Sequence, residues 1–152
     1  MKSFLHQAFT LARVSNLPTV WTNVLAAWAI NATASSTFKI MPEVCDFAFF
    51  DWNTFVCLLI GSSLIYAGGC TLNDAFDQDF DQAHNPKRPL PSGSISAQTV
   101  WILGSLELIL GGVLLVTVAG CEKTWVFALI ASVLFYDYIH KKWAGGIIIM
   151  GG

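Results

Sequence analysis

Four aspartates stand within eight residues of one another, directly after a long apolar run. In a continuous helix, at about 100° per residue, Asp74, Asp77 and Asp81 would fall within about 60° of one another. Asn73 would lie at the edge of that arc and Asp79 on the opposite side. Three carboxylates on one face stay ionised only when cations lie between them. Oxygen ligands favour Mg²⁺ before Ca²⁺, and Mg²⁺ commonly shares its shell with substrate phosphates. The spacing therefore predicts a magnesium and diphosphate site.

Two basic residues, Lys87 and Arg88, follow the acids in a proline-rich segment. Arginine suits bidentate phosphate contacts and lysine acts as a point charge. Positive charge beside a span also sets membrane topology, and both roles can hold at once. A calcium-binding EF-hand loop is excluded, because Gln82 stands where that loop needs glycine and Arg88 where it needs glutamate.

The composition is that of a multispanning membrane protein. The chain has 152 residues, of which 55% are hydrophobic and 12% charged, and its mean hydropathy is +0.59. These values are too apolar for an ordinary soluble domain. A net charge of −2 argues against a general nucleic-acid surface. We therefore expect a lipid bilayer as the surroundings and no nucleic-acid partner.

Four apolar stretches are close to the length that a bilayer requires. We expect an all-α transmembrane bundle that forms a single membrane domain, 1–152, with a motif loop at 73–98 and the opening of a fifth span after residue 144. The segment Met1–Ala12 is either an amphipathic helix in the membrane interface or a simple lead-in. The four expected spans are residues 14–32, 52–72, 99–119 and 124–138.

Polar residues inside these spans have two interpretations each. Asn16 and Asn23 are seven residues apart, so they share a helix face, where they either bond a neighbouring helix or contact a substrate. Glu107, inside the third span, is either a functional residue or a partner in a hydrogen bond between helices, and we favour the hydrogen bond. Glycines of the second and third spans predict close helix packing.

Positive charge gathers at one end of the expected bundle. Only Lys39 and Lys123 fall at the other end. By the positive-inside rule, the N-terminus, the acidic cluster and the end of the fourth span face the cytoplasm. The basic residues at that end are Lys2, Arg13, Lys87, Arg88, Lys141 and Lys142.

Three elements carry a resemblance to a known family. Asn73, Asp74, Asp77 and Asp81 resemble the N-D-x-x-D-x-x-x-D signature of the UbiA family of intramembrane prenyltransferases, and the N-P-K-R-P-L-P-S-G run after it is also similar. Tyr138 and Lys142, which are four apart, resemble the family's Y-x-x-x-K element. The polar start of the first span, with Arg13, Asn16 and Asn23, is similar too. The resemblance implies the first half of that all-helical fold.

The resemblance also implies a reaction, in which a prenyl group passes from an allylic diphosphate to an aromatic or similar acceptor within the membrane. Asn73, Asp74, Asp77 and Asp81 would hold Mg²⁺, which neutralises the leaving group. Catalytic roles would fall to Asp74, Asp77, Tyr138 and Lys142. Substrate binding would fall to Asn16, Asn23, Lys87, Arg88, Tyr138 and Lys142.

The family's second aspartate motif has no counterpart in these residues, and we expect a missing C-terminal half as a partner. Alternatives are an inactive truncated homologue and a non-catalytic membrane subunit. A small transporter is a further alternative, in which Glu107 and Asn23 would line the pathway.

Overall fold

The structure is a computed structural model that describes residues 4–37 and 51–139. Within these residues the chain is helical and contains no strand, which confirms the predicted all-α fold. In chain order the elements are α1 (Phe4–Leu11), the 3₁₀ turn η1 (Val14–Asn16), α2 (Leu17–Thr37), α3 (Trp52–Phe76), α4 (Gln78–His84), α5 (Ala97–Thr117) and α6 (Lys123–Ile139).

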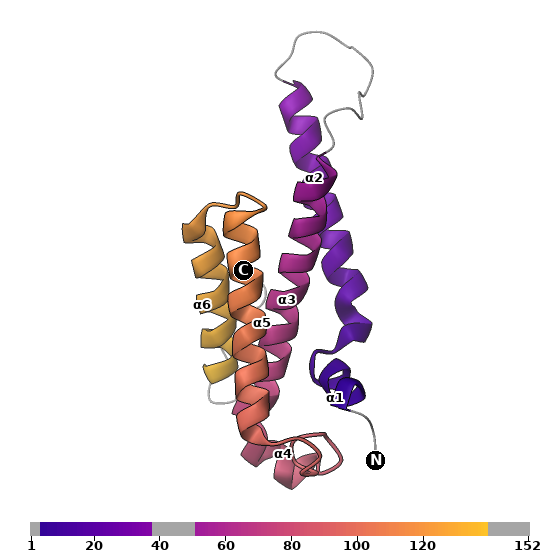
Figure 1. Ribbon diagram of the computed structural model, residues 1–152, viewed down its shortest axis with the longest axis vertical. Coiled ribbons are helices and arrows are strands. Elements are labelled where there is room, and N and C mark those ends of the chain that lie inside the picture. Colours follow the sequence, from indigo (N-terminus) through magenta and orange to yellow (C-terminus); the bar gives the residue numbers. More distant parts are fainter. Residues whose placement is uncertain (1–3, 38–50, 140–152) are drawn as a thin grey trace.

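The four long helices run alternately up and down (Figure 1). α3 is central and packs against α2, α5 and α6. The short helices α1 and α4 lie together at one end of the bundle, and the α5–α6 connection lies at the opposite end (Figure 1). The acidic segment and the N-terminal segment therefore share one end, as the charge pattern predicts.

Two of the described helices, α3 and α5, are long and apolar enough to cross a membrane. Ile102, Ile109 and Val113 of α5 are exposed, which suits a surface that faces lipid. α2 and α6 overlap the other two expected spans, and their crossing of the bilayer stays a prediction. The expected opening of a fifth span lies outside the described residues.

Glycines bring α3 and α5 into backbone contact. A Cβ atom on Gly68 would lie 2.9 Å from the carbonyl oxygen of Gly104, and one on Gly111 would lie 2.8 Å from that of Gly61. No larger side chain fits at these positions without parting the helices. The predicted close packing is confirmed, and α3 and α5 pack with their backbones in contact.

The first expected span begins later than the apolar pattern indicates. Arg13 adopts a left-handed conformation, with φ 46° and ψ 47°, which is uncommon outside glycine. The resulting turn separates α1 from α2, and Pro18 stands in the first turn of α2, where its missing N–H costs nothing. α2 then continues to Thr37 rather than ending at residue 32.

The expected motif loop at 73–98 is too long at its start. Residues 73–76 complete α3 and residues 78–84 form α4, so the connection to α5 covers only 85–96. α4 ends at His84 because Asn85, which precedes Pro86, is driven out of the helical region. Ser96 begins α5 as its N-cap, with the Thr99 amide donating to its hydroxyl at 3.1 Å.

The 85–96 connection is docked on the bundle. Leu90 and Ile95 are buried in a cluster with Leu11 of α1, Ala75 of α3 and Val100 of α5. Burial of this kind stabilises a loop by roughly 1.5–3 kcal/mol for each large apolar side chain. The cluster holds α1 and the proline-rich connection in place around the acidic segment.

Candidate functional site

The acids lie where α3 passes into α4. The helix is interrupted only at Asp77, and its hydrogen-bond ladder continues across the break. The Asp77 amide donates to the Asn73 carbonyl at 3.0 Å and the Asp81 amide to the Asp77 carbonyl at 2.9 Å. Asp74, Asp77 and Asp81 are 7%, 6% and 1% exposed, whereas Asp79 is exposed. The burial of these three acids and the exposure of Asp79 agree with the predicted shared face.

Two arginines supply cations to two of these acids, Asp74 and Asp81. Arg88 Nη1 donates to Asp81 Oδ2 at 2.5 Å and to Asp74 Oδ1 at 3.2 Å. Arg13 Nη2 donates to the same Asp74 oxygen at 3.3 Å. The acids are buried, but the arginine side chains are 38% and 40% exposed. The cluster is thus closed by guanidinium groups that keep one side open to solvent.

Side-chain amides complete the cluster. Asn85 Nδ2 donates to Asp81 Oδ1 at 3.0 Å, and Asn73 Nδ2 donates to Asp77 Oδ2 at 3.4 Å. Both oxygens of Asp81 therefore already accept hydrogen bonds. Asn73 is an expected member of the site, whereas sequence reasoning gave Asn85 no role. Its position directly before Pro86 is the signal that could have marked it.

The side chains do not fit a magnesium ion in this arrangement. The donor types suit Mg²⁺. In the part of the chain that the structure describes, however, no three histidine, cysteine or acidic side chains come together to hold a metal ion. Arg88 lies between Asp74 and Asp81, where a bridging cation would have to lie. The metal role of Asn73, Asp74, Asp77 and Asp81 stays a prediction.

Arg13 links the N-terminal turn to the acids. Burial lowers the pKa of its guanidinium, but Asp74, with smaller contributions from Cys70 and Tyr66, raises that pKa above its ordinary value. The group is therefore a permanent cation. Its strained backbone is held from one side by the buried Leu11 and from the other by the ion pair.

A fourth acid reaches the cluster from α6. Asp137 is 6% exposed and lies within electrostatic reach of Asp77 and Arg13. Among the described residues, Asp77 has a larger electrostatic effect on Asp137 than Arg13 has. Sequence reasoning missed this because Asp137 stands outside the aspartate motif. An ionisable residue inside an apolar helix was the available signal.

Tyr138 lies apart from this buried acid. Its side chain is 60% exposed, and its ring meets that of Phe76 edge-on at 6.5 Å between centroids. Phe76 in turn packs on Trp101 at 4.8 Å. Lys142, the second half of the Y-x-x-x-K element, lies outside the described residues. The catalytic and substrate-binding roles of Tyr138 and Lys142 stay predictions.

The remaining expected substrate contacts are spread over one end of the bundle. Asn16 lies beside Tyr66 of α3, close to the Arg13 turn. Asn23 is exposed on α2, about 10 Å further along the helix by its seven-residue spacing. Lys87 is exposed, whereas its neighbour Arg88 turns into the acids. Of this group, the structure brings only Arg88 into contact with the acids.

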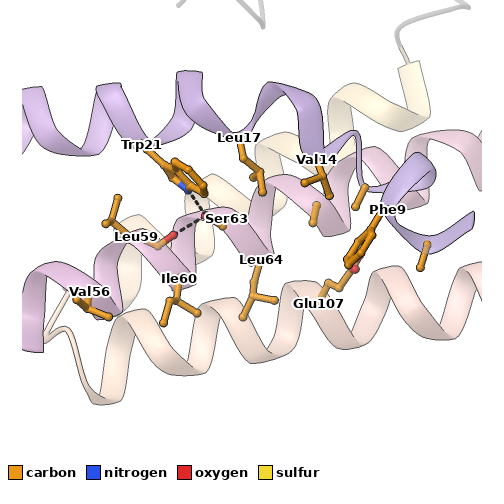
Figure 2. Close-up of a pocket in the computed structure, with 13 residues that line it drawn as sticks. Phe9, Val14, Leu17, Trp21, Val56, Leu59, Ile60, Ser63, Leu64 and Glu107 are labelled. Carbon is orange, nitrogen blue, oxygen red and sulfur yellow. Dashed lines mark hydrogen bonds between the residues drawn. The ribbon is translucent and has the colours of Figure 1, made fainter. Parts of the chain in front are cut away.

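An apolar groove of about 550 Å³ lies where α1, α2 and α3 meet (Figure 2). Trp21 Nε1 donates to Ser63 Oγ at 2.9 Å, which joins α2 to α3 across the groove. Glu107 of α5 lines the far side, where it accepts a hydrogen bond from Thr71 Oγ1 at 3.0 Å. That bond confirms the favoured interpretation of Glu107. The lining is otherwise apolar, with Ala8, Phe9, Ala12, Val14, Leu17, Val56, Leu59, Ile60, Leu64 and Ala67.

The groove follows the same face of α3 that carries Asp74. At about 100° per residue, Val56, Ile60, Ser63 and Ala67 all fall within about 40° of Asp74. They precede it by 7 to 18 residues, which is about 10–27 Å along the helix. The lining residues Ala12 and Val14 also flank Arg13, which binds Asp74. One end of the groove thus adjoins the acidic cluster.

Comparison with known proteins identifies the family. The model of the UbiA prenyltransferase family matches residues 44–152. The chain is 30% identical over 100 residues to a 4-hydroxybenzoate octaprenyltransferase of Polaromonas sp. (strain JS666), a match that covers 64% of this chain and 35% of the relative. It is 33% identical over 127 residues to the chloroplastic chlorophyll synthase of Arabidopsis thaliana, covering 80% of this chain and 31% of the relative.

A third relative is the digeranylgeranylglyceryl phosphate synthase of Sulfolobus acidocaldarius, which is 38% identical over 91 residues, or 59% of this chain and 32% of the relative. The chain thus spans about a third of the length of the curated relatives it matches. No solved structure matches it. The family match, together with the acids at the α3–α4 junction, shows that the chain belongs to the UbiA prenyltransferase family.

Proposed function

We propose that the chain forms the diphosphate-binding end of an enzyme that transfers a prenyl group from an allylic diphosphate within the membrane. One observation carries the proposal. Arginines that bind buried acids keep an exposed side at the end of the spanning helices, and an apolar groove begins next to them. This arrangement supports the binding of a molecule with an anionic head and an apolar tail.

The arginines suit the head of such a molecule. Arg88 and Arg13 are oriented by Asp74 and Asp81, so that they are held in place before a ligand arrives. Cations at this end of the bundle would stabilise the negative charge that develops on a departing diphosphate. Arg88 and Arg13 would therefore bind the diphosphate oxygens and favour breakage of the carbon–oxygen bond.

The groove suits the tail. An isoprenoid chain that enters between α2 and α3 would meet only apolar side chains, apart from Ser63 and Glu107. Ser63 is hydrogen-bonded to Trp21 and to the Leu59 carbonyl, and one carboxyl oxygen of Glu107 accepts from Thr71, so these polar groups are largely engaged within the protein. The axial alignment with Asp74 would keep the tail in line with the head.

The proposal names only a broad class of acceptor, and it includes a Mg²⁺ requirement on separate grounds. The relatives are named for different products, so we propose only an aromatic or similar acceptor that is soluble in the membrane. In this arrangement Arg88 is ion-paired with Asp74 and Asp81. The proposed requirement for Mg²⁺ is therefore based on the donor types and the family resemblance, and not on the observed geometry. The full reaction would need further helices, since the chain spans about a third of its relatives.

Binding of radiolabelled prenyl diphosphate to membranes that contain the full chain tests the proposal. We expect saturable binding that Asp77→Asn lowers at least tenfold. Asp79→Asn is the matched control, because Asp79 lies two residues before the motif's last aspartate, on the exposed side of α4, and this variant should bind as the wild type does. Equal binding by the wild type and by Asp77→Asn would contradict the proposal. A chelator added to the wild type tests the cation requirement separately.

A further inference from the structure

We propose that Arg88 is an internal counter-cation, which keeps divalent cations off the acidic cluster until a diphosphate draws its guanidinium away. The inference rests on the proposed function, since it describes the same site before substrate arrives. It begins from the disagreement between the donor types, which suit a metal ion, and their arrangement, which does not hold one.

The oxygens of the cluster are already occupied. Asp81 is 1% exposed, its Oδ2 accepts from Arg88 and its Oδ1 accepts from Asn85. The same Arg88 nitrogen also donates to Asp74. A single Nη1 atom thus bridges the two carboxylates. Any cation that bridged Asp74 and Asp81 would have to replace that nitrogen.

The side chain of Arg88 can leave while its backbone stays. The Arg88 amide donates to the Asn85 carbonyl at 3.1 Å, and its carbonyl accepts from the Ser92 amide at 3.0 Å. Prolines on either side of Lys87 and Arg88 restrict the backbone further. The side chain, which is 38% exposed, is the part of Arg88 that could turn toward solvent. A diphosphate that arrived from that side would offer it more negative charge than Asp81 does.

Arg13 does not share this role. It contacts Asp74 alone, at 3.3 Å, and leaves Asp81 untouched. Its backbone is fixed in the left-handed turn, next to the buried Leu11 and Ala12. Withdrawal of Arg88 would therefore free both Asp81 Oδ2 and one contact on Asp74, while Arg13 continues to neutralise Asp74.

The inference predicts effects of opposite sign for one substitution. Removal of the Arg88 charge should strengthen the binding of a divalent cation alone, because the competing guanidinium is gone. The same removal should weaken the binding of pyrophosphate, because a donor is lost. An ion pair that only stabilised the fold would change neither the cation affinity nor the pyrophosphate affinity. A residue that only bound phosphate would give the loss without the gain.

The test uses the full chain in lipid nanodiscs and Mn²⁺ as the probe, with free Mn²⁺ measured by electron paramagnetic resonance. We expect Arg88→Gln to bind Mn²⁺ about tenfold more tightly than the wild type, in line with loss of one charge-assisted contact. Arg88→Lys keeps a cation and should bind as the wild type does. Lys123→Gln removes one positive charge at the opposite end of the bundle and controls for net charge.

Two further measurements complete the test. Asp81→Asn in the Arg88→Gln background should abolish the gain, which would assign it to the cluster. Inorganic pyrophosphate should bind Arg88→Gln more weakly than the wild type by a similar factor. If Arg88→Gln bound Mn²⁺ no more tightly than the wild type, while circular dichroism showed unchanged helix content, the inference would be overturned. If Arg88→Gln lost helix content, Arg88→Met would replace it as the variant without the charge. The inference would then be overturned if a folded Arg88→Met bound Mn²⁺ no more tightly than Arg88→Lys.

The Mn²⁺ measurement is independent of the proposed function. A gain in Arg88→Gln without any prenyl diphosphate binding would keep the counter-cation and refute the transferase proposal. Prenyl diphosphate binding that depends on Asp77, without a gain in Mn²⁺ affinity in Arg88→Gln, would support the transferase proposal and overturn the counter-cation.

Discussion

Substitution of Asp81 and substitution of Arg88 should lower the free energy of unfolding by different amounts, although both break the same ion pair. Asp81 is 1% exposed, whereas the Arg88 side chain is 38% exposed. Asp81→Asn removes the buried charge and leaves an arginine that can still reach Asp74 and water. We expect it to lower the free energy of unfolding by about 1–2 kcal/mol, the worth of one charge-assisted hydrogen bond discounted for exposure.

Arg88→Gln leaves the buried Asp81 carboxylate close to Asp74 and without its nearest cation. Removing one partner of a buried pair costs about 3–5 kcal/mol, and the partial exposure of Arg88 reduces this to about 2–4 kcal/mol. We therefore expect Arg88→Gln to destabilise the chain more than Asp81→Asn. The double variant should resemble Asp81→Asn, because the charge that Arg88 neutralises is no longer there.

Unfolding of purified protein by titration with a denaturing detergent, followed by circular dichroism, measures all three variants. The double-variant cycle isolates the coupling between the two side chains. Additive losses in the double variant, or a larger loss in Asp81→Asn than in Arg88→Gln, would refute the account of the cluster as a buried acid held by an exposed cation.

Three further predictions concern the elements around the site. Gly68→Ala should lower the free energy of unfolding by about 1–3 kcal/mol in the same titration, because its Cβ meets the backbone of α5; Gly112→Ala should cost less, since its Cβ meets side chains alone, the tip of Ile130 at 3.0 Å and Val126 at an ordinary 3.8 Å. Glu107→Gln should change stability by less than about 1 kcal/mol, because an amide oxygen can still accept from Thr71; a larger loss would mean that the charge matters. Leu11→Ala, at a fully buried site, should cost about 2–5 kcal/mol and speed proteolysis of the 85–96 connection, measured by limited digestion.

The helices and the shared face of the acids could be predicted because both follow from local periodicity. Asp74, Asp77 and Asp81 repeat at helical spacing, and the burial of all three agrees with that pattern. The end of α4 is also predictable, since Asn85 precedes a proline. The expected loop instead starts at residue 73, the first polar residue after the apolar run, and so includes residues that are helical. Polarity alone was the wrong criterion for the end of the helix.

The partners of the acids could not be predicted, because they depend on tertiary contacts. Arg13 and Asp74 are 61 residues apart, and nothing in the sequence fixes their meeting. The left-handed turn that brings Arg13 there is unusual for arginine, so propensity argues against it. Asp137 approaches Asp77 through the packing of α6 on α3, which one sequence does not reveal.

If the groove binds an isoprenoid tail, as proposed, the glycine contacts between α3 and α5 decide which helix can move to accept a longer one. Because the two backbones touch, α3 cannot yield toward α5 when a bulkier chain enters between α2 and α3. Accommodation has to come from α2, whose principal polar tie across the groove is the Trp21–Ser63 bond. Preference for short or long isoprenoids would then be decided by residues on α2, and variants with a smaller side chain at Trp21 are the place to look for a changed preference.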